Sequence, residues 1–123
     1  MIFGVGTDIA DVRRFEKWVL KDDMCRRFFN EAELMEKGSL QSKCQHYAAR
    51  FAAKEAFSKA LGMGLCFDLK NVYITNEANG RPKLNIFGDA KKLLLELVGD
   101  CKIHVSLSHE KAFATAFVVI EKK

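Results

Sequence analysis

The sequence is poor in the residues that interrupt folded structure. Its 123 residues include one proline and eight glycines, and no segment rich in proline, glycine or serine divides them. Hydrophobic residues make up 49% of the chain and charged residues 29%, values typical of a globular protein. This composition excludes a disordered or linker-rich chain, and the length predicts one domain over residues 1–123.

The sequence also lacks the features of a secreted or membrane-spanning protein. Its first residues have neither the basic segment nor the long apolar segment of a signal peptide. Its apolar runs are far shorter than the ~20 residues that cross a bilayer. The four cysteines form no CxxC pair. We therefore expect reduced thiols, a cytoplasmic location and no association with a membrane.

Excess charge of one sign is small. Twenty basic residues against sixteen acidic ones give a net charge of +4. This balance fits an anionic partner, whether a nucleotide, an acidic protein or a nucleic acid, without choosing among them. The basic residues are scattered, and no aromatic-rich basic strand of the RNA-recognition type is present. A nucleic-acid-binding module is therefore the weaker alternative, and we expect no nucleic-acid partner.

The spacing of apolar residues predicts an α+β fold, with a long helix packed on an antiparallel sheet. Strands are expected at residues 2–9, 72–75, 83–86, 102–108 and 112–121, and the main helices at 11–20, 43–61 and 89–98. Asn79-Gly80 is a turn signal between the second and third strands, and Pro82 indicates an edge strand. The last strand is nearly all apolar, so we expect it at the centre of the sheet or at an oligomer interface.

Helix 43–61 has one side of small residues. At about 100° per residue, its alanines fall together, which lets a neighbouring backbone approach closely. The polar residues occupy the opposite side. The alanines are Ala49, Ala53, Ala56 and Ala60, and the polar residues are Arg50, Lys54, Glu55, Ser58 and Lys59.

Two places carry residues suited to phosphate and metal chemistry. Asp8 stands where the first apolar strand ends, although a carboxylate there is also a common turn or cap residue. Glu55, Ser58, Lys59 and Gly62 line one stripe of the long helix. A carboxylate and an ammonium group on this stripe could hold a divalent cation and a phosphate oxygen together. Spacing alone favours a simpler interpretation, a Glu55–Lys59 ion pair on a solvated helix face.

Two further groupings have weaker chemical support. His109 follows Ser106-Leu107-Ser108, but no G-x-S-x-G sequence surrounds these serines, so a turn histidine is the simpler interpretation. Cys44-Gln45-His46 and Cys101-x-x-His104 contain zinc ligand types. They are two isolated pairs, one on a helix and one entering a strand, which disfavours a zinc site.

Three segments taken in order resemble a known family. They are residues 4–9 (GVGTDI), 50–62 (RFAAKEAFSKALG) and 105–109 (VSLSH), and the Asn79-Gly80-Arg81-Pro82 turn is similar to the N-G-x-P turn of the same family. Together they resemble the 4′-phosphopantetheinyl transferase superfamily in its short form, the holo-acyl-carrier-protein synthases. The likeness covers residues 1–121.

The resemblance implies transfer of 4′-phosphopantetheine from coenzyme A to a serine of apo-acyl carrier protein, with release of adenosine 3′,5′-bisphosphate. Asp8 and Glu55 match the family's Mg²⁺ ligands, and carboxylates are the ligands that this ion prefers. Lys59 matches the lysine that contacts the diphosphate. Glu55 matches the base as well, acting on the carrier serine directly or through a metal-bound water.

The remaining contacts also come from the resemblance. Coenzyme A contacts are implied for Ser58, Gly62, Gly80, Arg81 and Pro82, and contacts to its nucleotide end for Arg50, Ser108 and His109. Arg14 matches the position that docks the acidic carrier, and Arg26 and Arg27 lie near the second docking element. The family's short members are homotrimers with sites shared between subunits. A degenerate member that only binds coenzyme A is disfavoured, because Asp8, Glu55 and Lys59 are all present.

Overall fold

The structure is a computed structural model that describes residues 1–123, with residue 22 described through its backbone alone. Its elements, in chain order, are β1 (Ile2–Asp11), the 3₁₀ turn η1 (Val12–Phe15), α1 (Glu16–Leu20), α2 (Asp22–Phe28), η2 (Glu31–Glu33), α3 (Leu40–Leu61), η3 (Leu69–Asn71), β2 (Val72–Asn76), β3 (Pro82–Ile86), α4 (Gly88–Leu97), β4 (Cys101–His109) and β5 (Phe113–Lys122). All five predicted strands are present, which confirms the α+β class. No helix in the described part of the chain is long and apolar enough to cross a membrane.

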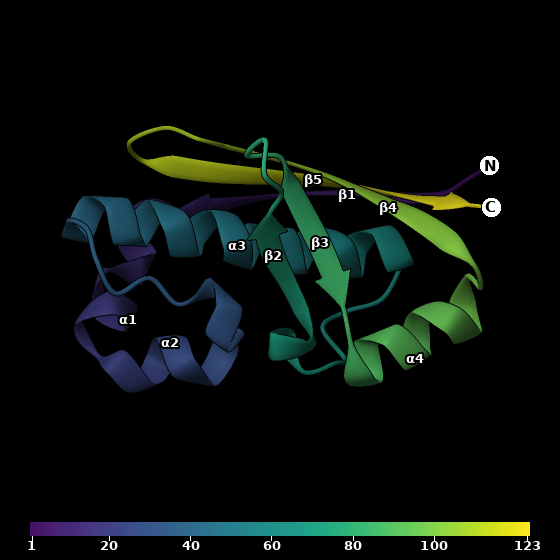
Figure 1. The fold of residues 1–123 in the computed structure, drawn as a ribbon, viewed down its shortest axis with the longest axis horizontal. Helices are drawn as coiled ribbons and strands as arrows, with labels where there is room; N and C mark the ends of the chain where they lie inside the picture. The colour runs from purple at the N-terminus through teal and green to yellow at the C-terminus, as the bar shows by residue number, and fades with distance from the viewer.

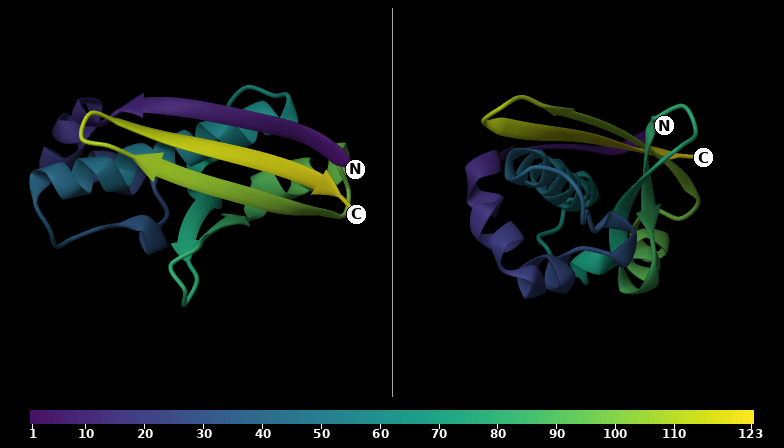
Figure 2. Two further views of the ribbon diagram at one scale, coloured as in Figure 1. Left: turned by 90° about the horizontal axis from the view of Figure 1, so that it is seen from above. Right: turned by 60° about the vertical axis from the view of Figure 1, so that its left-hand side comes forward.

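The strands form two antiparallel sheets. β1, β5 and β4 pair in that order, so the apolar last strand is central, as predicted. The second sheet is the β2–β3 hairpin. Figure 1 shows α3 lying along the larger sheet, with α1, α2 and α4 on the side of α3 away from that sheet. In the view from above, the hairpin turn projects beyond β4, whereas β1 forms the opposite edge of the sheet (Figure 2).

Local signals define where the helices begin. The Asp11 carboxylate accepts a hydrogen bond from the Arg13 amide at 2.9 Å, as expected of a cap. The predicted helix 11–20 is nevertheless divided, into the 3₁₀ turn η1 and the short helix α1. Asn30 and Glu33 form a full capping box around η2. α3 begins three residues earlier than predicted, because the Ser39 hydroxyl caps it through the Ser42 amide.

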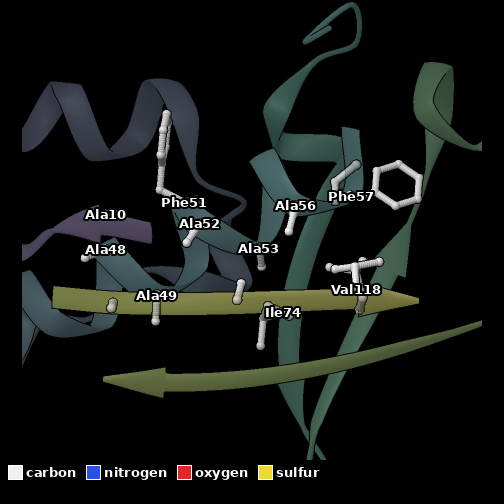
Figure 3. Packing of buried hydrophobic residues seen from close by; sticks show 14 of the residues in the cluster. Ala10, Ala48, Ala49, Phe51, Ala52, Ala53, Ala56, Phe57, Ile74 and Val118 are labelled. Carbon is white, nitrogen blue, oxygen red and sulfur yellow. The ribbon is translucent and has the colours of Figure 1, made fainter. Parts of the chain in front are cut away.

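Glycines in β1 allow the strand to lie directly on α3. A Cβ at Gly4 would lie 2.0 Å from the Ala60 carbonyl oxygen, and one at Gly6 would lie 2.0 Å from the Ala56 oxygen. No side chain fits in that space. Figure 3 shows Ala49 and Ala53 of α3 next to the central strand β5, which carries Val118. This confirms the close backbone approach predicted from the alanine side of the helix.

The larger sheet has one buried and one open face. Residues of β5 alternate between the two: Ala114, Ala116, Val118 and Ile120 are buried, whereas Phe113 and Phe117 are 42% and 47% exposed. On β1, Val5 and Ile9 are 56% and 63% exposed. These four exposed residues define what we term the outer apolar face of the sheet.

Candidate active site

The first site residues meet where β1 crosses α3. The Lys59 ammonium lies 3.0 Å from Asp8 Oδ1 and 3.0 Å from the Thr7 carbonyl oxygen. The Asp8 side chain is 18% exposed and that of Lys59 53% exposed, so the pair opens to solvent. The ion pair of Lys59 is therefore made with Asp8 on the neighbouring strand. The interpretation of Lys59 as the partner of Glu55 on a solvated helix face is wrong.

Glu55 belongs to the same cluster. Burial raises the pKa of its carboxyl group, and the negative charge of Asp8 raises this pKa further. The charges of Lys59 and Arg14 act in the opposite direction. Two carboxylates and an ammonium group thus influence one another at the junction of β1 and α3, although Asp8 and Glu55 are far apart in the chain.

The donor set of this cluster fits Mg²⁺. The ion takes oxygen ligands and is usually held by one or two carboxylates, with phosphate and water completing its shell. Asp8 and Glu55 provide two such carboxylates at the junction of β1 and α3. Among the described residues no group of three or more His, Cys, Asp or Glu side chains converges. The histidines of the two zinc-type pairs are engaged elsewhere: His46 Nε2 donates to the Glu33 carbonyl oxygen and His104 pairs with Glu121.

A second group lies on the β4 side of α3. Arg50 and His109 line one pocket of about 240 Å³, together with His46 and Leu107. The Arg50 Nε is buried and has no hydrogen-bond partner among the described residues, and one terminal nitrogen donates weakly to the His46 carbonyl oxygen at 3.4 Å. Two nitrogen-bearing side chains predicted to contact an anion therefore face one cavity.

Ser108 and Ser58 do not join these groups. Ser108 is exposed on β4, on the face opposite that of Leu107. Ser58 is 2% exposed, and its hydroxyl donates to the Glu55 carbonyl oxygen at 2.7 Å. The Ser58 hydroxyl is therefore used within the helix, which does not fit the expectation that it contacts coenzyme A. Gly62 ends α3 in the left-handed conformation, with φ of 77° and open space around it.

The hairpin turn carries the remaining predicted contacts. Gly80 has φ of 85°, its amide donates to the Glu77 carbonyl oxygen, and the Arg81 amide donates to the Asn79 side chain. Pro82 begins β3. The turn projects beyond β4, at one edge of the sheet, whereas Asp8 lies on β1, which forms the other edge (Figure 2).

Arg14 lies next to the carboxylate cluster on a platform of aromatic rings. Its guanidinium is 4.9 Å from the Phe51 ring centre and 6.0 Å from that of Trp18. Cation–π contacts of this kind hold an exposed arginine in one orientation. Arg26 and Arg27 are exposed in the last turn of α2, and Arg26 lines a separate pocket of about 280 Å³.

Sequence reasoning missed one functional candidate, the buried pair of Lys54 and Glu33. Lys54 belongs to the polar side of the helix, opposite the alanines, but it is fully buried. The sequence does contain a signal for Glu33. The Asn30–Glu33 capping box predicts that the Glu33 side chain turns back toward the Asn30 amide. Nothing local predicts its lysine partner 21 residues later.

Comparisons with known proteins identify the class to which this fold and these residues belong. A sequence profile of the 4′-phosphopantetheinyl transferase superfamily matches residues 4–118, so the chain belongs to that superfamily. The chain is 47% identical to the holo-[acyl-carrier-protein] synthase of Treponema denticola, over 98% of this chain and 99% of the relative. The predicted resemblance to the holo-acyl-carrier-protein synthases is confirmed.

Solved structures agree with this assignment. The holo-[acyl-carrier-protein] synthase of Neisseria meningitidis has a TM-score of 0.83 and 35% identity, covering 99% of this chain and all of that one. That of Bacillus anthracis, solved in complex with coenzyme A (3′,5′-ADP), has a TM-score of 0.78 and 32% identity, covering 100% and 99%. The similarity in both cases extends over the whole chain.

Proposed function

We propose that this protein transfers 4′-phosphopantetheine from coenzyme A to a serine of apo-acyl carrier protein and releases adenosine 3′,5′-bisphosphate. The observation that carries the proposal is the meeting of Asp8, Glu55 and Lys59 at the β1–α3 junction. The coenzyme A complex of the Bacillus anthracis relative supports coenzyme A as the substrate. Residues 1–123 would form one catalytic domain, and a cytoplasmic location stays a prediction from the sequence.

Asp8 and Glu55 would hold Mg²⁺. When bound, the ion would neutralise charge on the diphosphate of coenzyme A. The Lys59 ammonium, half exposed beside Asp8, would contact a diphosphate oxygen as a compact positive charge. Its bond to the Thr7 carbonyl oxygen holds it at the edge of β1. The chain thus provides a preorganised positive group at the position where negative charge develops.

Glu55 would act as the base. The carrier serine oxygen forms a bond to the β-phosphorus of coenzyme A, and the bond from that phosphorus to the leaving phosphate breaks with its electron pair. The serine proton goes to the Glu55 carboxylate and then to solvent. A carboxyl group with a raised pKa is a better proton acceptor than an ordinary one, and burial and Asp8 both raise that of Glu55.

The complete site would be shared between subunits of a homotrimer. Within one chain, the Asp8 cluster lies on the β1 side, and the Arg50–His109 pocket and the hairpin turn lie on the β4 side. A second copy would bring these two groups together around one coenzyme A molecule. The outer apolar face supports assembly, because Val5, Ile9, Phe113 and Phe117 would otherwise remain in water.

The acidic carrier would dock on Arg14, Arg26 and Arg27. Arg14 is suited to this role, since it is exposed, held by aromatic rings and close enough to Glu55 to affect its charge. A carrier bound there would present its serine to the carboxylate cluster. Charge complementarity of this kind chiefly raises association rate and specificity.

Intact-mass spectrometry tests the proposed function. The protein is incubated with an apo-carrier and coenzyme A, with Mg²⁺ in one sample and excess EDTA in another. The carrier should gain the mass of one phosphopantetheine only with Mg²⁺. A protein that binds coenzyme A in calorimetry but leaves the carrier mass unchanged in both samples would contradict the proposal.

A further inference from the structure

The interior of the molecule contains a fully satisfied ion pair between Lys54 on α3 and Glu33 in η2. The Lys54 Nζ lies 2.7 Å from Glu33 Oε1, 2.9 Å from the Leu69 carbonyl oxygen and 2.5 Å from that of Val72. The two side chains are 1% and 0% exposed. Three acceptors around one nitrogen require three N–H donors, which only the charged ammonium form supplies. Lys54 is therefore a buried cation.

Glu33 joins this cation to further segments. Its Oε1 also accepts from the Asn30 amide at 3.1 Å, and its Oε2 accepts from the Ile74 amide at 3.0 Å. All of these partners are donors, which fits an ionised carboxylate. Through Val72 and Ile74 the pair binds the first strand of the hairpin, and the hairpin carries the Gly80–Pro82 turn. The pair thus connects α3, η2 and β2.

Lys54 also lies on the side of α3 away from Lys59, the lysine of the carboxylate cluster. Lys54 and Lys59 are five positions apart, which places them about 140° from each other around the axis. One binds Glu33 and the hairpin, and the other binds Asp8 and β1. Rotation of α3 about its axis is therefore restrained from two sides.

This restraint matters because the contact between α3 and β1 lacks interlocking side chains. Ala56 and Ala60 meet Gly6 and Gly4 there, and none of these residues provides a large interlocking side chain. Side-chain atoms of a helix lie about 5–6 Å from its axis, so a rotation of about 10° moves them by about 1 Å. A displacement of that size at a catalytic group can lower a rate by about 10²-fold.

We infer that the Lys54–Glu33 pair positions the site. It sets the rotation of α3, and therefore the placement of Glu55 and Lys59 relative to Asp8. It also fixes the base of the β2–β3 hairpin. The inference rests on the proposed function. The pair also bonds backbone groups of other segments and so contributes to stability, which means that its effects on stability and on kcat have to be measured separately.

The test replaces both charges with apolar side chains, as Glu33→Leu/Lys54→Met, and compares the double variant with wild type. Lys123→Met, which removes a half-exposed lysine near Asp100, is the matched control. We expect the double variant to melt cooperatively but below wild type, because the Val72 carbonyl and the Ile74 amide lose their side-chain partners. Its kcat should fall at least about tenfold. Its KM for the carrier should stay within about twofold, because Arg14 belongs to η1 and also contacts Trp18 of α1, neither of which lies on α3.

A folded double variant with wild-type kcat and KM values would overturn the inference. If the double variant does not fold, Glu33→Gln takes its place, because it keeps the shape of the side chain while it removes the charge and replaces one acceptor oxygen by an NH₂ group. A fall in kcat with unchanged carrier KM then supports the inference, and wild-type kinetics overturn it.

A crystal structure of the folded variant separates this inference from the proposed function. If the wild-type protein transfers nothing, the function fails, but the Lys59–Asp8 separation still reports the position of α3. An increase from 3.0 Å to beyond about 4 Å supports positioning by the pair, and an unchanged contact overturns it.

Discussion

Lys59 and Asp8 are 51 positions apart in the chain, yet the ammonium of one lies 3.0 Å from the carboxylate of the other. The contact joins the middle of β1 to the last turns of α3. It exists because the two glycines of β1 allow the strand to lie against the helix backbone. The contact links the closest packing in the molecule to its proposed chemistry.

The first prediction concerns Lys59 itself. Lys59→Met should lower phosphopantetheine transfer by about 10²-fold or more, because the positive charge facing the diphosphate is lost. Stability should change by less than about 1 kcal/mol, since the ion pair is partly exposed. Lys92→Met, at an exposed position on α4, is the control for removing a lysine. Transfer rates and urea unfolding measured on both variants check the prediction.

The second prediction concerns the contact of Gly6 with α3. Gly6→Ala places a Cβ 2.0 Å from the Ala56 carbonyl oxygen, so strand and helix must separate. We expect a loss of at least about 2 kcal/mol in the free energy of unfolding. Gly64→Ala is the control, because a Cβ there meets nothing within 4 Å. Equal stabilities of the two variants would contradict the packing described for β1.

The third prediction concerns pH and His46. Burial, assisted by the charge of Arg50, lowers the pKa of His46 from 6.5 to about 4. Between these values the unfolded chain binds a proton that the folded protein does not, so stability should fall as the pH decreases from 6.5 toward 4. The loss should approach about 3 kcal/mol at most.

Urea unfolding at pH 6.5 and pH 5 measures this effect. The lowered pKa values of Asp11, Asp89 and Glu121 affect stability only below their ordinary values, outside this range. The raised pKa of Glu55 acts in the opposite direction, because the folded protein binds that proton more readily than the unfolded chain as the pH falls. His46→Gln should remove most of the pH dependence. A variant that keeps the full dependence on pH would show that another group is responsible.

The fourth prediction concerns assembly. Ala116 is 1% exposed and faces α3, so Ala116→Arg should prevent folding. Thr115 lies on the open side of β5, beside Phe117 of the outer apolar face. Thr115→Arg should give a folded chain that dissociates in light scattering and loses transfer, because the proposed site is shared. A fully active monomer would contradict the shared site.

The fifth prediction concerns docking of the carrier. Arg14→Glu should weaken carrier binding far more than coenzyme A binding, because like charges then face each other. Binding of the carrier to the wild-type protein should weaken as salt is added. Calorimetric titrations of both ligands check this, and carrier binding that does not respond to salt would exclude the arginine surface.

The strands and the alanine side of α3 could be predicted because their signals are local. The alanine side of α3 predicts that a neighbouring backbone approaches closely, and the structure places β1 there at Gly4 and Gly6. The alternation of Ile103, Val105 and Leu107 likewise gives the side of β4 that packs, partly buried, against the core. In each case neighbouring residues carry the whole pattern.

The role of Lys54 could not be predicted in the same way. Helical periodicity places it with Arg50 and Lys59 on the polar side, and a polar side ordinarily faces water. Its burial depends on Glu33, Leu69 and Val72, which belong to other segments. Which side of β5 is exposed could not be predicted for a related reason. Both faces of that strand are apolar, and only packing on α3 distinguishes them.

The most direct test of the account is transfer by the two carboxylate variants, Asp8→Asn and Glu55→Gln, across a Mg²⁺ titration. Both keep the size of the side chain, so circular dichroism should match that of wild type. The account predicts that transfer to the carrier falls by about 10²-fold or more in each variant, and that wild-type transfer requires Mg²⁺. A folded variant of either kind with near wild-type transfer at saturating Mg²⁺ would contradict the assignment of the site.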